Sequence, residues 1–212
     1  MPQAAEKAAV TRMEKANGHN RRKAATRKAL MSAARKLFSE ASYDTVTLHD
    51  VARATGYTRQ TVYTHFHSKW GLLQAIAEPI FAIGDAQHAE FAKMRDPTPA
   101  QIEDWLWGRV RMLRENIEIV RLLWQATAYD PEGFDSEYQR ETRVIEVLAE
   151  GHPAFARALS GPSAALVDVK ARLLLQRMDA ACLNVARGWK SHSAYAIGLI
   201  AQEFHAFMTD ED

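Results

Sequence analysis

Four side chains between residues 59 and 64 have the chemistry needed to read the edges of DNA base pairs. An arginine can donate two hydrogen bonds to guanine, a glutamine can pair with adenine through two bonds, and a threonine methyl suits thymine. Each helical residue turns by about 100°, so with Val62 facing a core, Gln60 and Thr64 point to the opposite side. Thr61 flanks them, and Arg59 is long enough to reach a base from the first turn. We predict that these four side chains contact bases.

A second set of side chains offers hydroxyl, imidazole and ammonium groups to phosphate oxygens. Contacts of this kind fix a protein on the DNA backbone and carry no sequence information directly. We predict phosphate contacts from Thr47, Tyr63, His65 and Lys69.

Two short helices joined by a tight turn would position these groups, and the surrounding sequence predicts them. Thr47 followed by Asp50 has the pattern of a capping box at the start of the first helix. Gly56 follows that helix, where a left-handed backbone costs least for a residue without a Cβ. Thr58 then predicts the cap of a second helix, residues 59–65.

This arrangement is a helix-turn-helix, in which the second helix enters the DNA major groove. Tyr57 is expected to fill the angle between the helices, and the small Ala52 lets them approach closely. The same two-helix pattern also occurs inside enzymes as ordinary helix packing. The pattern alone therefore leaves both interpretations open.

Residues 26–76 resemble the DNA-binding domain of the TetR family of transcriptional repressors. That pattern has a helix ending in Leu-Phe, an aromatic residue, a capping Thr, a turn Gly, then Thr-(apolar)-Tyr-x-His-Phe and Ser-Lys. The chain agrees in order and spacing at Leu37, Phe38, Tyr43, Thr47, Ala52, Gly56, Thr61, Val62, Tyr63, His65, Phe66, Ser68, Lys69 and Leu72. It departs at Ser42 (commonly Gly), Gln60 (commonly small) and Trp70 (usually acidic). The resemblance implies an all-α homodimer that represses transcription from a palindromic operator and is released by a small molecule.

Composition and charge fit this interpretation. The 212 residues, 47% hydrophobic and 25% charged, suit one large or two small globular domains. One cysteine, Cys182, excludes an intramolecular disulfide, and no apolar run approaches a membrane span. We therefore expect a cytoplasmic protein without a membrane partner. The net charge is only +1, yet residues 1–28 hold eight Lys and Arg against two Glu, which places the positive charge beside the helix-turn-helix.

Three parts are expected along the chain: a flexible basic arm (1–20), a helix-turn-helix domain (21–67) and a helical regulatory and dimerisation domain (68–212). Residues 21–23, Arg-Arg-Lys, either extend the arm onto the DNA backbone or minor groove or belong to a solvated tail. The first firm helix is predicted from residue 22 to residue 40.

A fourth helix is predicted over residues 69–94, with Ser68 as its cap. Pro79 lies inside it and predicts a kink or break, because proline removes a helical hydrogen bond. In the resembling family this helix transmits ligand binding to the DNA heads, so Pro79 either shapes that coupling or makes a static bend. Turn signals, including one at 130–133, divide the rest into helices at 99–114, 117–129, 134–150, 162–187 and 193–208. A short helical segment is expected between the turns at 151–153 and 160–162.

The second domain is expected to hold a ligand and a partner subunit. Trp105, Arg109, Met112 and Trp124 are predicted to line a pocket for a small apolar or aromatic effector, with core packing and an exposed arginine as the alternative. The last two helices carry more apolar surface than one core needs. We predict a dimer interface of Leu166, Val169, Leu173, Ile197, Ile200 and Phe204, with burial inside one monomer as the alternative.

Signals for catalysis, metals and cofactors are missing from the sequence. His65 and His67 diverge by about 200° on a helix and cannot share an ion from one face. No Gly-rich phosphate loop, Gly-x-Ser-x-Gly or metal-ligand motif occurs. We therefore predict a non-enzyme without a cofactor. A DNA-binding protein that needs no ligand and an all-helical enzyme stay open as rivals.

Overall fold

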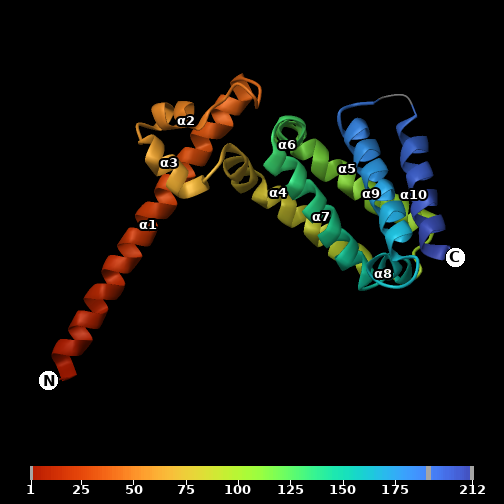
Figure 1. Ribbon diagram of the computed structural model, residues 1–212, viewed down its shortest axis with the longest axis horizontal. Coiled ribbons are helices and arrows are strands. Elements are labelled where there is room, and N and C mark those ends of the chain that lie inside the picture. The colour runs from red at the N-terminus through yellow and green to blue at the C-terminus, as the bar shows by residue number, and fades with distance from the viewer. Residues whose placement is uncertain (1, 190–191, 211–212) are drawn as a thin grey trace. The chain divides into compact units, whose positions relative to one another are not determined.

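The computed structural model describes residues 2–189 and 192–210, and over these residues the chain forms α-helices and no strand (Figure 1). The all-α prediction is confirmed. The helices are α1 (Pro2–Glu40), α2 (Leu48–Thr55), α3 (Arg59–Phe66), α4 (Lys69–Ala92), α5 (Pro99–Glu115), α6 (Ile117–Tyr129), α7 (Pro131–Ala149), α8 (Pro153–Leu159), α9 (Ala164–Ala186) and α10 (Ser193–Thr209). The chain divides into two compact units, Met1–Ile76 and Ala77–Asp212.

The first unit is a small helical domain built on the second half of α1. Apolar side chains spaced by four residues on α1 are buried and pack with the apolar faces of α2, α3 and the first turns of α4. Because each of these short helices has one apolar face, they hold together only as a group. The buried side chains are Leu30, Ala34, Phe38, Val51, Val62, Phe66, Leu72, Leu73 and Ile76.

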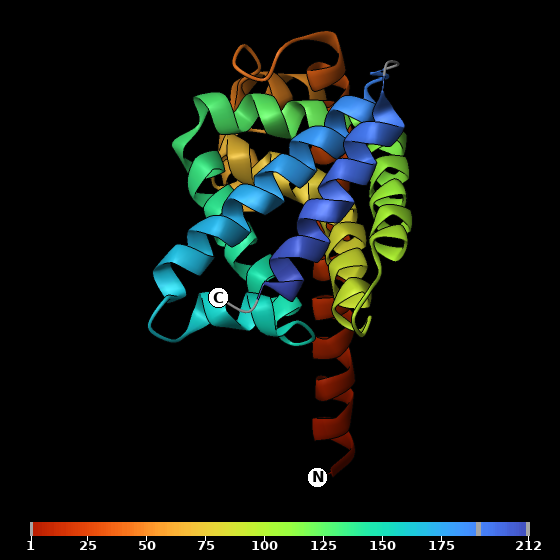
Figure 2. The same cartoon turned by 90° about the vertical axis from the view of Figure 1, so that its right-hand side faces the viewer.

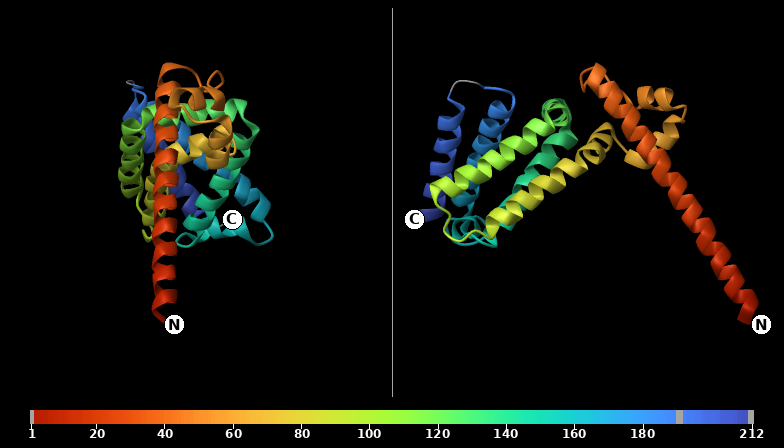
Figure 3. Two further views of the ribbon diagram at one scale, coloured as in Figure 1. Left: turned by 90° about the vertical axis from the view of Figure 1, so that its left-hand side faces the viewer. Right: turned by 180° about the vertical axis from the view of Figure 1, so that it is seen from behind.

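Helix α1 begins much earlier than expected and runs well past α2 and α3 (Figure 3). We predicted its start at Arg22, but the helix begins at Pro2. Residues 2–21 are rich in Ala, Lys and Glu, which are strong helix formers, so the helix continues without an apolar face. The backbone of residues 2–20 is therefore helical, whereas the side chains of residues 1–17 lie outside the part described.

The boundary between the units falls inside α4, nine residues after the predicted division at 67/68. Trp70, Leu72 and Ile76 are buried in the first unit, and the Arg35 guanidinium donates a hydrogen bond to the Ile76 carbonyl at 3.2 Å. The start of α4 thus completes the core of the helix-turn-helix domain. The helix is unbroken at Pro79, so the predicted break is absent.

The second unit packs α5 against α9 and α10, with α8 against α7 and α9. Helices α9 and α10 lie side by side (Figure 2). The indole of Trp105 lies 4.3 Å from the ring of Phe91 and 5.8 Å from that of Phe204, so aromatic packing joins α4, α5 and α10. No helix of the described chain is long and apolar enough to cross a membrane.

The start of α7 corrects one expectation. We predicted a turn over residues 130–133, but Asp130 caps the helix by accepting a hydrogen bond from the Glu132 amide at 3.1 Å. Pro131 then occupies the first helical position, where its missing N–H costs nothing.

Candidate nucleic-acid interface and regulatory cavity

Local hydrogen bonds set the ends of α2 and α3 as the sequence predicts. The Thr47 hydroxyl accepts from the Asp50 amide at 3.2 Å, and the Asp50 carboxylate accepts from the Thr47 amide at 3.0 Å. Gly56 has φ 72°, the left-handed end expected for α2. The Thr58 hydroxyl accepts from the Thr61 amide at 3.1 Å and caps α3. Both caps and the turn glycine are confirmed.

The opposite faces of α3 have opposite environments. Val62 and Phe66 are buried in the core, whereas Arg59, Gln60 and Thr64 are exposed. Burial of the apolar face thus leaves amide, guanidinium and hydroxyl groups facing solvent on one short helix.

The predicted base contacts differ in how their side chains are held. Arg59 donates to the Tyr63 hydroxyl at 3.2 Å, and its guanidinium lies 5.3 Å from the Tyr63 ring centroid. The Thr64 hydroxyl donates to the Gln60 carbonyl at 2.8 Å, so its methyl group is left for an apolar contact. Thr61 is half-buried, and its hydroxyl pairs with that of Thr58 at 2.9 Å. The four residues lie together on α3, and their contacts with bases stay a prediction.

The predicted phosphate contacts are more engaged within the protein. The Thr47 hydroxyl donates to the Asp50 carboxylate at 2.6 Å as part of the helix cap. The Lys69 ammonium donates to the Tyr43 carbonyl at 2.8 Å and lies 4.2 Å from the Tyr43 ring centroid. Lys69 therefore ties the start of α4 to the loop after α1, a structural contact that the sequence did not predict.

His65 is half-buried near the end of α3. Burial lowers the pKa of its imidazole, and the positive charges of Lys23 and Arg27 lower that pKa further. The ring is therefore neutral near pH 7 and suits a phosphate as a hydrogen-bond donor, not as a cation.

Arg27 is a structural residue of this site that sequence reasoning missed. Its guanidinium donates to the His65 carbonyl at 2.9 Å and lies 4.5 Å from the Phe66 ring centroid. An arginine suits this place because the last carbonyls of a helix carry partial negative charge. The available signal was its spacing of three residues before Leu30, on the apolar face of α1. Tyr57, expected to fill the angle between helices, is 40% exposed instead.

Charge is divided sharply between the two units. Met1–Ile76 contains thirteen Lys and Arg against five Asp and Glu, a net +8. Ala77–Asp212 contains fourteen against twenty-one, a net −7. The unit that carries the helix-turn-helix is thus the one suited to a polyanion.

The second unit contains a cavity of about 120 Å³ between α4, α5, α6, α7 and α9. Three of the four predicted pocket residues, Arg109, Met112 and Trp124, line it. Trp105 does not line this cavity: its indole N–H donates to the Gln87 carbonyl at 3.1 Å, and its ring packs on Phe91 in the aromatic core. The spacing of four residues places Trp105 and Arg109 on the same side of α5. Spacing alone does not show which of the two packs in the core and which lines the cavity.

Arg109 is half-buried, with its side chain 11% exposed, so it is not the exposed surface arginine of the alternative. Its guanidinium donates from Nε at 2.9 Å and from Nη2 at 2.6 Å to one oxygen of Asp179 on α9. His88, which sequence analysis did not select, lies beside this pair, with Nε2 3.5 Å from Arg109 Nη1. Burial, followed by the charge of Arg109, lowers the pKa of His88 to about 4.

The predicted dimer residues separate into two groups. On α9, Leu166, Val169 and Leu173 are 60%, 52% and 55% exposed, an uncovered apolar face. On α10 the prediction was wrong: Ile197, Ile200 and Phe204 are buried in the core of the monomer, packed with residues of α5 and α9. The exposed apolar side chains of α10 are instead Tyr195 and Leu199. Sequence periodicity located the apolar stripe of α10 but not the partner that covers it.

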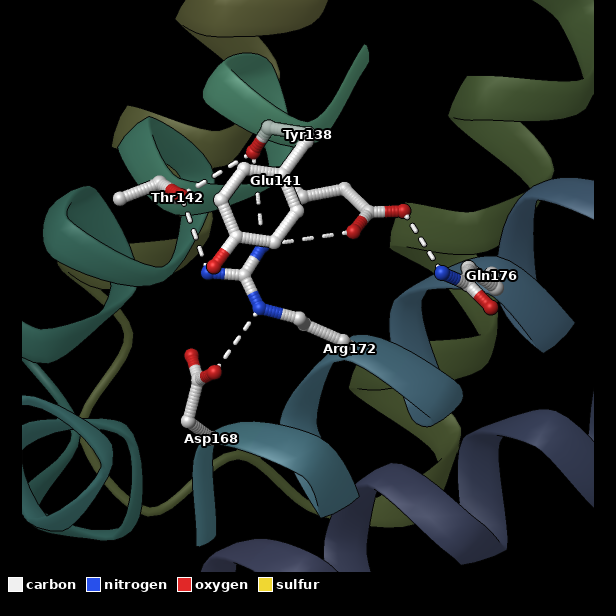
Figure 4. A network of polar contacts seen from close by, with 6 residues as sticks. All are labelled: Tyr138, Glu141, Thr142, Asp168, Arg172 and Gln176. Atoms are coloured by element: carbon white, nitrogen blue, oxygen red, sulfur yellow. Dashed lines mark hydrogen bonds and ion pairs between the residues drawn. The ribbon is translucent and has the colours of Figure 1, made fainter. Parts of the chain in front are cut away.

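Arg172 joins the exposed helix α9 to α7 (Figure 4). Its guanidinium donates to Asp168 at 2.9 Å, to the Thr142 hydroxyl at 2.9 Å and to Glu141 at 3.4 Å. The guanidinium also lies 4.1 Å from the Tyr138 ring centroid. Glu141 lines the cavity, so one carboxylate belongs both to the cavity wall and to the contacts of α9.

Comparison with known proteins agrees with the helix-turn-helix geometry. Residues 30–76 match the family model described as bacterial regulatory proteins, tetR family. Residues 30–76 are thus similar to the DNA-binding domain of TetR-family regulators. Members of this family are transcriptional regulators, not enzymes, and the resemblance inferred from the sequence is confirmed.

Two curated proteins, both from Mycobacterium tuberculosis, are similar to part of this chain. The HTH-type transcriptional regulator AlkX is 42% identical over 55 residues, 26% of each chain. The HTH-type transcriptional repressor Rv1474c is 31% identical over 97 residues, 43% of this chain and 51% of that protein. The matches thus span about a quarter and about half of the relatives' lengths.

Solved structures extend the similarity in fold to most of the chain. NalD of Pseudomonas aeruginosa, the secondary repressor of the MexAB-OprM multidrug efflux pump, aligns with a TM-score of 0.56 and 19% identity over 87% of this chain and 96% of NalD. A putative TetR-family regulator from Mesorhizobium loti aligns with a TM-score of 0.54 and 18% identity over 88% of this chain and 96% of that chain. Both therefore share the fold of this chain over most of its length.

Proposed function

We propose that this protein is a ligand-responsive transcriptional repressor in the cytoplasm, which binds a palindromic operator as a homodimer and is released by a small molecule. The observation that carries the proposal is α3. Its apolar side is buried, its polar side is exposed, and it lies in the unit with a net charge of +8. A short helix of this kind fits the major groove and offers side chains to base edges.

The division of labour follows from the contacts. Gln60, Arg59, Thr61 and Thr64 read bases, and Tyr63 and His65 hold phosphates next to them. Thr47 and Lys69 add phosphate contacts while they fix the ends of α2 and α4. The exposed polar face of α3 speaks against the all-helical enzyme, since helices that merely pack inside an enzyme would bury Gln60 and Thr64.

Dimerisation places two such heads on one DNA duplex. The exposed leucines and valine of α9, with Tyr195 and Leu199 of the neighbouring α10, are candidates for a self-complementary interface. Two identical heads require half-sites separated by one helical turn of DNA, about 34–36 Å, or a little more.

The cavity supports regulation by a ligand over constitutive binding. A small molecule that fits one arrangement of α4 to α9 better than another shifts the protein toward that arrangement. The resulting change in operator affinity equals the difference in ligand affinity between the two arrangements.

Selection of bound duplexes from a random pool tests the central claim. We expect enrichment of an inverted repeat whose half-sites follow the spacing above. Failure to retain any duplex at low salt would refute DNA binding, and enrichment of a single unrepeated site would refute the symmetric dimer.

A further inference from the structure

The cavity of the second unit is lined by more negative than positive groups. Four carboxylates face two guanidiniums, while the neighbouring His88 is neutral because burial lowers its pKa to about 4. The acidic residues are Asp85, Glu137, Glu141 and Asp179, and the basic ones are Arg109 and Arg140.

Each guanidinium at the cavity already has a partner. Arg109 is paired with Asp179 at 2.6 Å, and Arg140 is paired with Glu137 at 3.2 Å. The Arg140 guanidinium also covers the Phe81 ring, 4.0 Å from its centroid. An anionic ligand would have to compete with carboxylates that are held in place by the fold.

The remaining carboxylates are less fully compensated. Glu141 forms an ion pair at 3.4 Å with Arg172, which does not line the cavity. Arg172 also forms an ion pair with Asp168 (Figure 4). Asp85, at the exposed side, makes no hydrogen bond or ion pair with the residues that the structure describes. The cavity therefore has an excess of negative charge even after all pairs are counted.

Glu137, although paired with Arg140, lies near two further carboxylates of the cavity. Burial raises the pKa of its carboxyl, Arg140 lowers it, and the negative charges of Asp179 and Glu141 raise it again. A cation bound beside Glu137 would stabilise the ionised form of this carboxyl.

The rest of the wall suits an apolar body. Side chains from several helices supply aliphatic, thioether and aromatic surface: Ile80, Phe81, Met112, Val120, Trp124 and Leu175. A volume of about 120 Å³ is of the size that holds one aromatic ring, since an apolar cavity of about 150 Å³ binds benzene.

His88 adds one directed polar group. The residue is 5% exposed, and the Gly84 backbone, one turn earlier on α4, acts on its ring through a hydrogen bond. Arg109 can only donate, so Nε2 of His88 acts as the acceptor and the ring proton belongs on Nδ1.

We propose that the effector of this cavity is a small organic cation, with an ammonium group beside Glu137 and an apolar or aromatic body. The inference rests on the proposed function only in that the cavity holds an effector. The net charge of −7 on this unit also favours cations over anions at its surface.

Three probes with one body and different charge test the inference on the full chain by calorimetry: 2-phenylethylammonium, 2-phenylethanol and phenylacetate. We expect the ammonium to bind about tenfold more tightly than the alcohol, and the carboxylate to bind most weakly. Glu137→Gln should weaken the ammonium about tenfold and leave the alcohol unchanged. Glu146→Gln, an exposed site on the same helix outside the cavity, should change neither.

Three results would overturn the proposal: an alcohol or carboxylate that binds as tightly as the ammonium, no ammonium binding at millimolar concentration, or equal effects of Glu137→Gln and Glu146→Gln. If Glu137→Gln does not fold, Asp85→Asn removes an exposed, unpaired carboxylate of the same cavity and should weaken the ammonium alone. The protein could select an operator and yet show no preference for the ammonium. That result would refute only the ligand class and would not contradict the proposed function.

Discussion

Replacing Gln60 by alanine should remove the reading of one base pair in each half-site without affecting the fold. The Gln60 side chain is exposed on α3 and forms no hydrogen bond with other described residues, so nothing in the domain depends on it. Alanine is a strong helix former, and surface changes of this kind shift stability by less than about 0.5 kcal/mol. A lost bidentate contact with adenine costs about 1–3 kcal/mol, and the midpoint of that range corresponds to roughly a 30-fold loss of affinity.

Fluorescence anisotropy with the selected operator measures this loss. Single base-pair variants of the operator should show that Gln60→Ala abolishes discrimination at one position in each half-site and keeps it elsewhere. Gln139→Ala is the matched control, because Gln139 is equally exposed on α7 of the other unit and lines no cavity.

Two results would refute the assignment. An equal loss of affinity for operator and random DNA would make Gln60 a backbone contact. A fall in the melting temperature would show that its side chain supports the fold, contrary to its exposure.

The other predictions concern the anchor, the cavity and the interface. Lys69→Ala should lower the free energy of unfolding by about 2 kcal/mol, because hydrogen bonds from charged groups contribute about 1.5–3 kcal/mol. If Lys69 also holds a phosphate, the same change should flatten the slope of log affinity against log salt by roughly 0.9. The control is Lys36→Ala, at an exposed lysine of α1, which should change neither urea unfolding nor that slope. Acid should destabilise the protein through His88, since the unfolded chain takes up a proton near pH 6.5 and the folded protein only near pH 4, which removes about 3 kcal/mol as the pH falls through this window. An unchanged acid dependence of unfolding in His88→Gln would contradict this. Leu173→Glu should convert dimers to monomers in sedimentation velocity, whereas Leu159→Glu, at an exposed apolar position of α8, should not.

Local chemistry explains why the helix-turn-helix was predictable from sequence. The caps at Thr47 and Thr58 and the left-handed Gly56 use groups within three or four residues of one another. The apolar spacing of α3 then decides which face is buried, and the exposed face follows by elimination. Hydrogen bonds between residues close in sequence can be predicted from residue types at short spacing. The ends of α2 and α3 are set largely by such bonds.

Packing between helices far apart in sequence was harder to predict, because periodicity shows that a helix has an apolar face but not what covers that face. The stripe of Ile197, Ile200 and Phe204 faces α5 and α9 of its own monomer, whereas that of Leu166 and Leu173 faces solvent. Both stripes look alike in sequence. The pairing of Arg109 with Asp179 likewise joins residues separated by 70 positions.

The start of α1 was missed for a different reason. Helix prediction depended on an apolar face, and residues 2–21 have none. Intrinsic helix propensity alone continues the helix from the packed segment, because adding a residue to an existing helix avoids the cost of a new nucleus.

The opposite charges of the two units connect DNA binding with the proposed ligand class. A polyanion is attracted to the unit with a net +8 and repelled by the unit with a net −7, so charge alone favours contact through the helix-turn-helix domain. The same negative field raises the local concentration of small cations at the regulatory unit. Its reach is about 10 Å at 0.1 M salt, so it assists the approach of a ligand and does not explain selectivity within the cavity. Selectivity must come from carboxylates at contact distance, and Glu137 is the carboxylate of the cavity wall that the charged probes test.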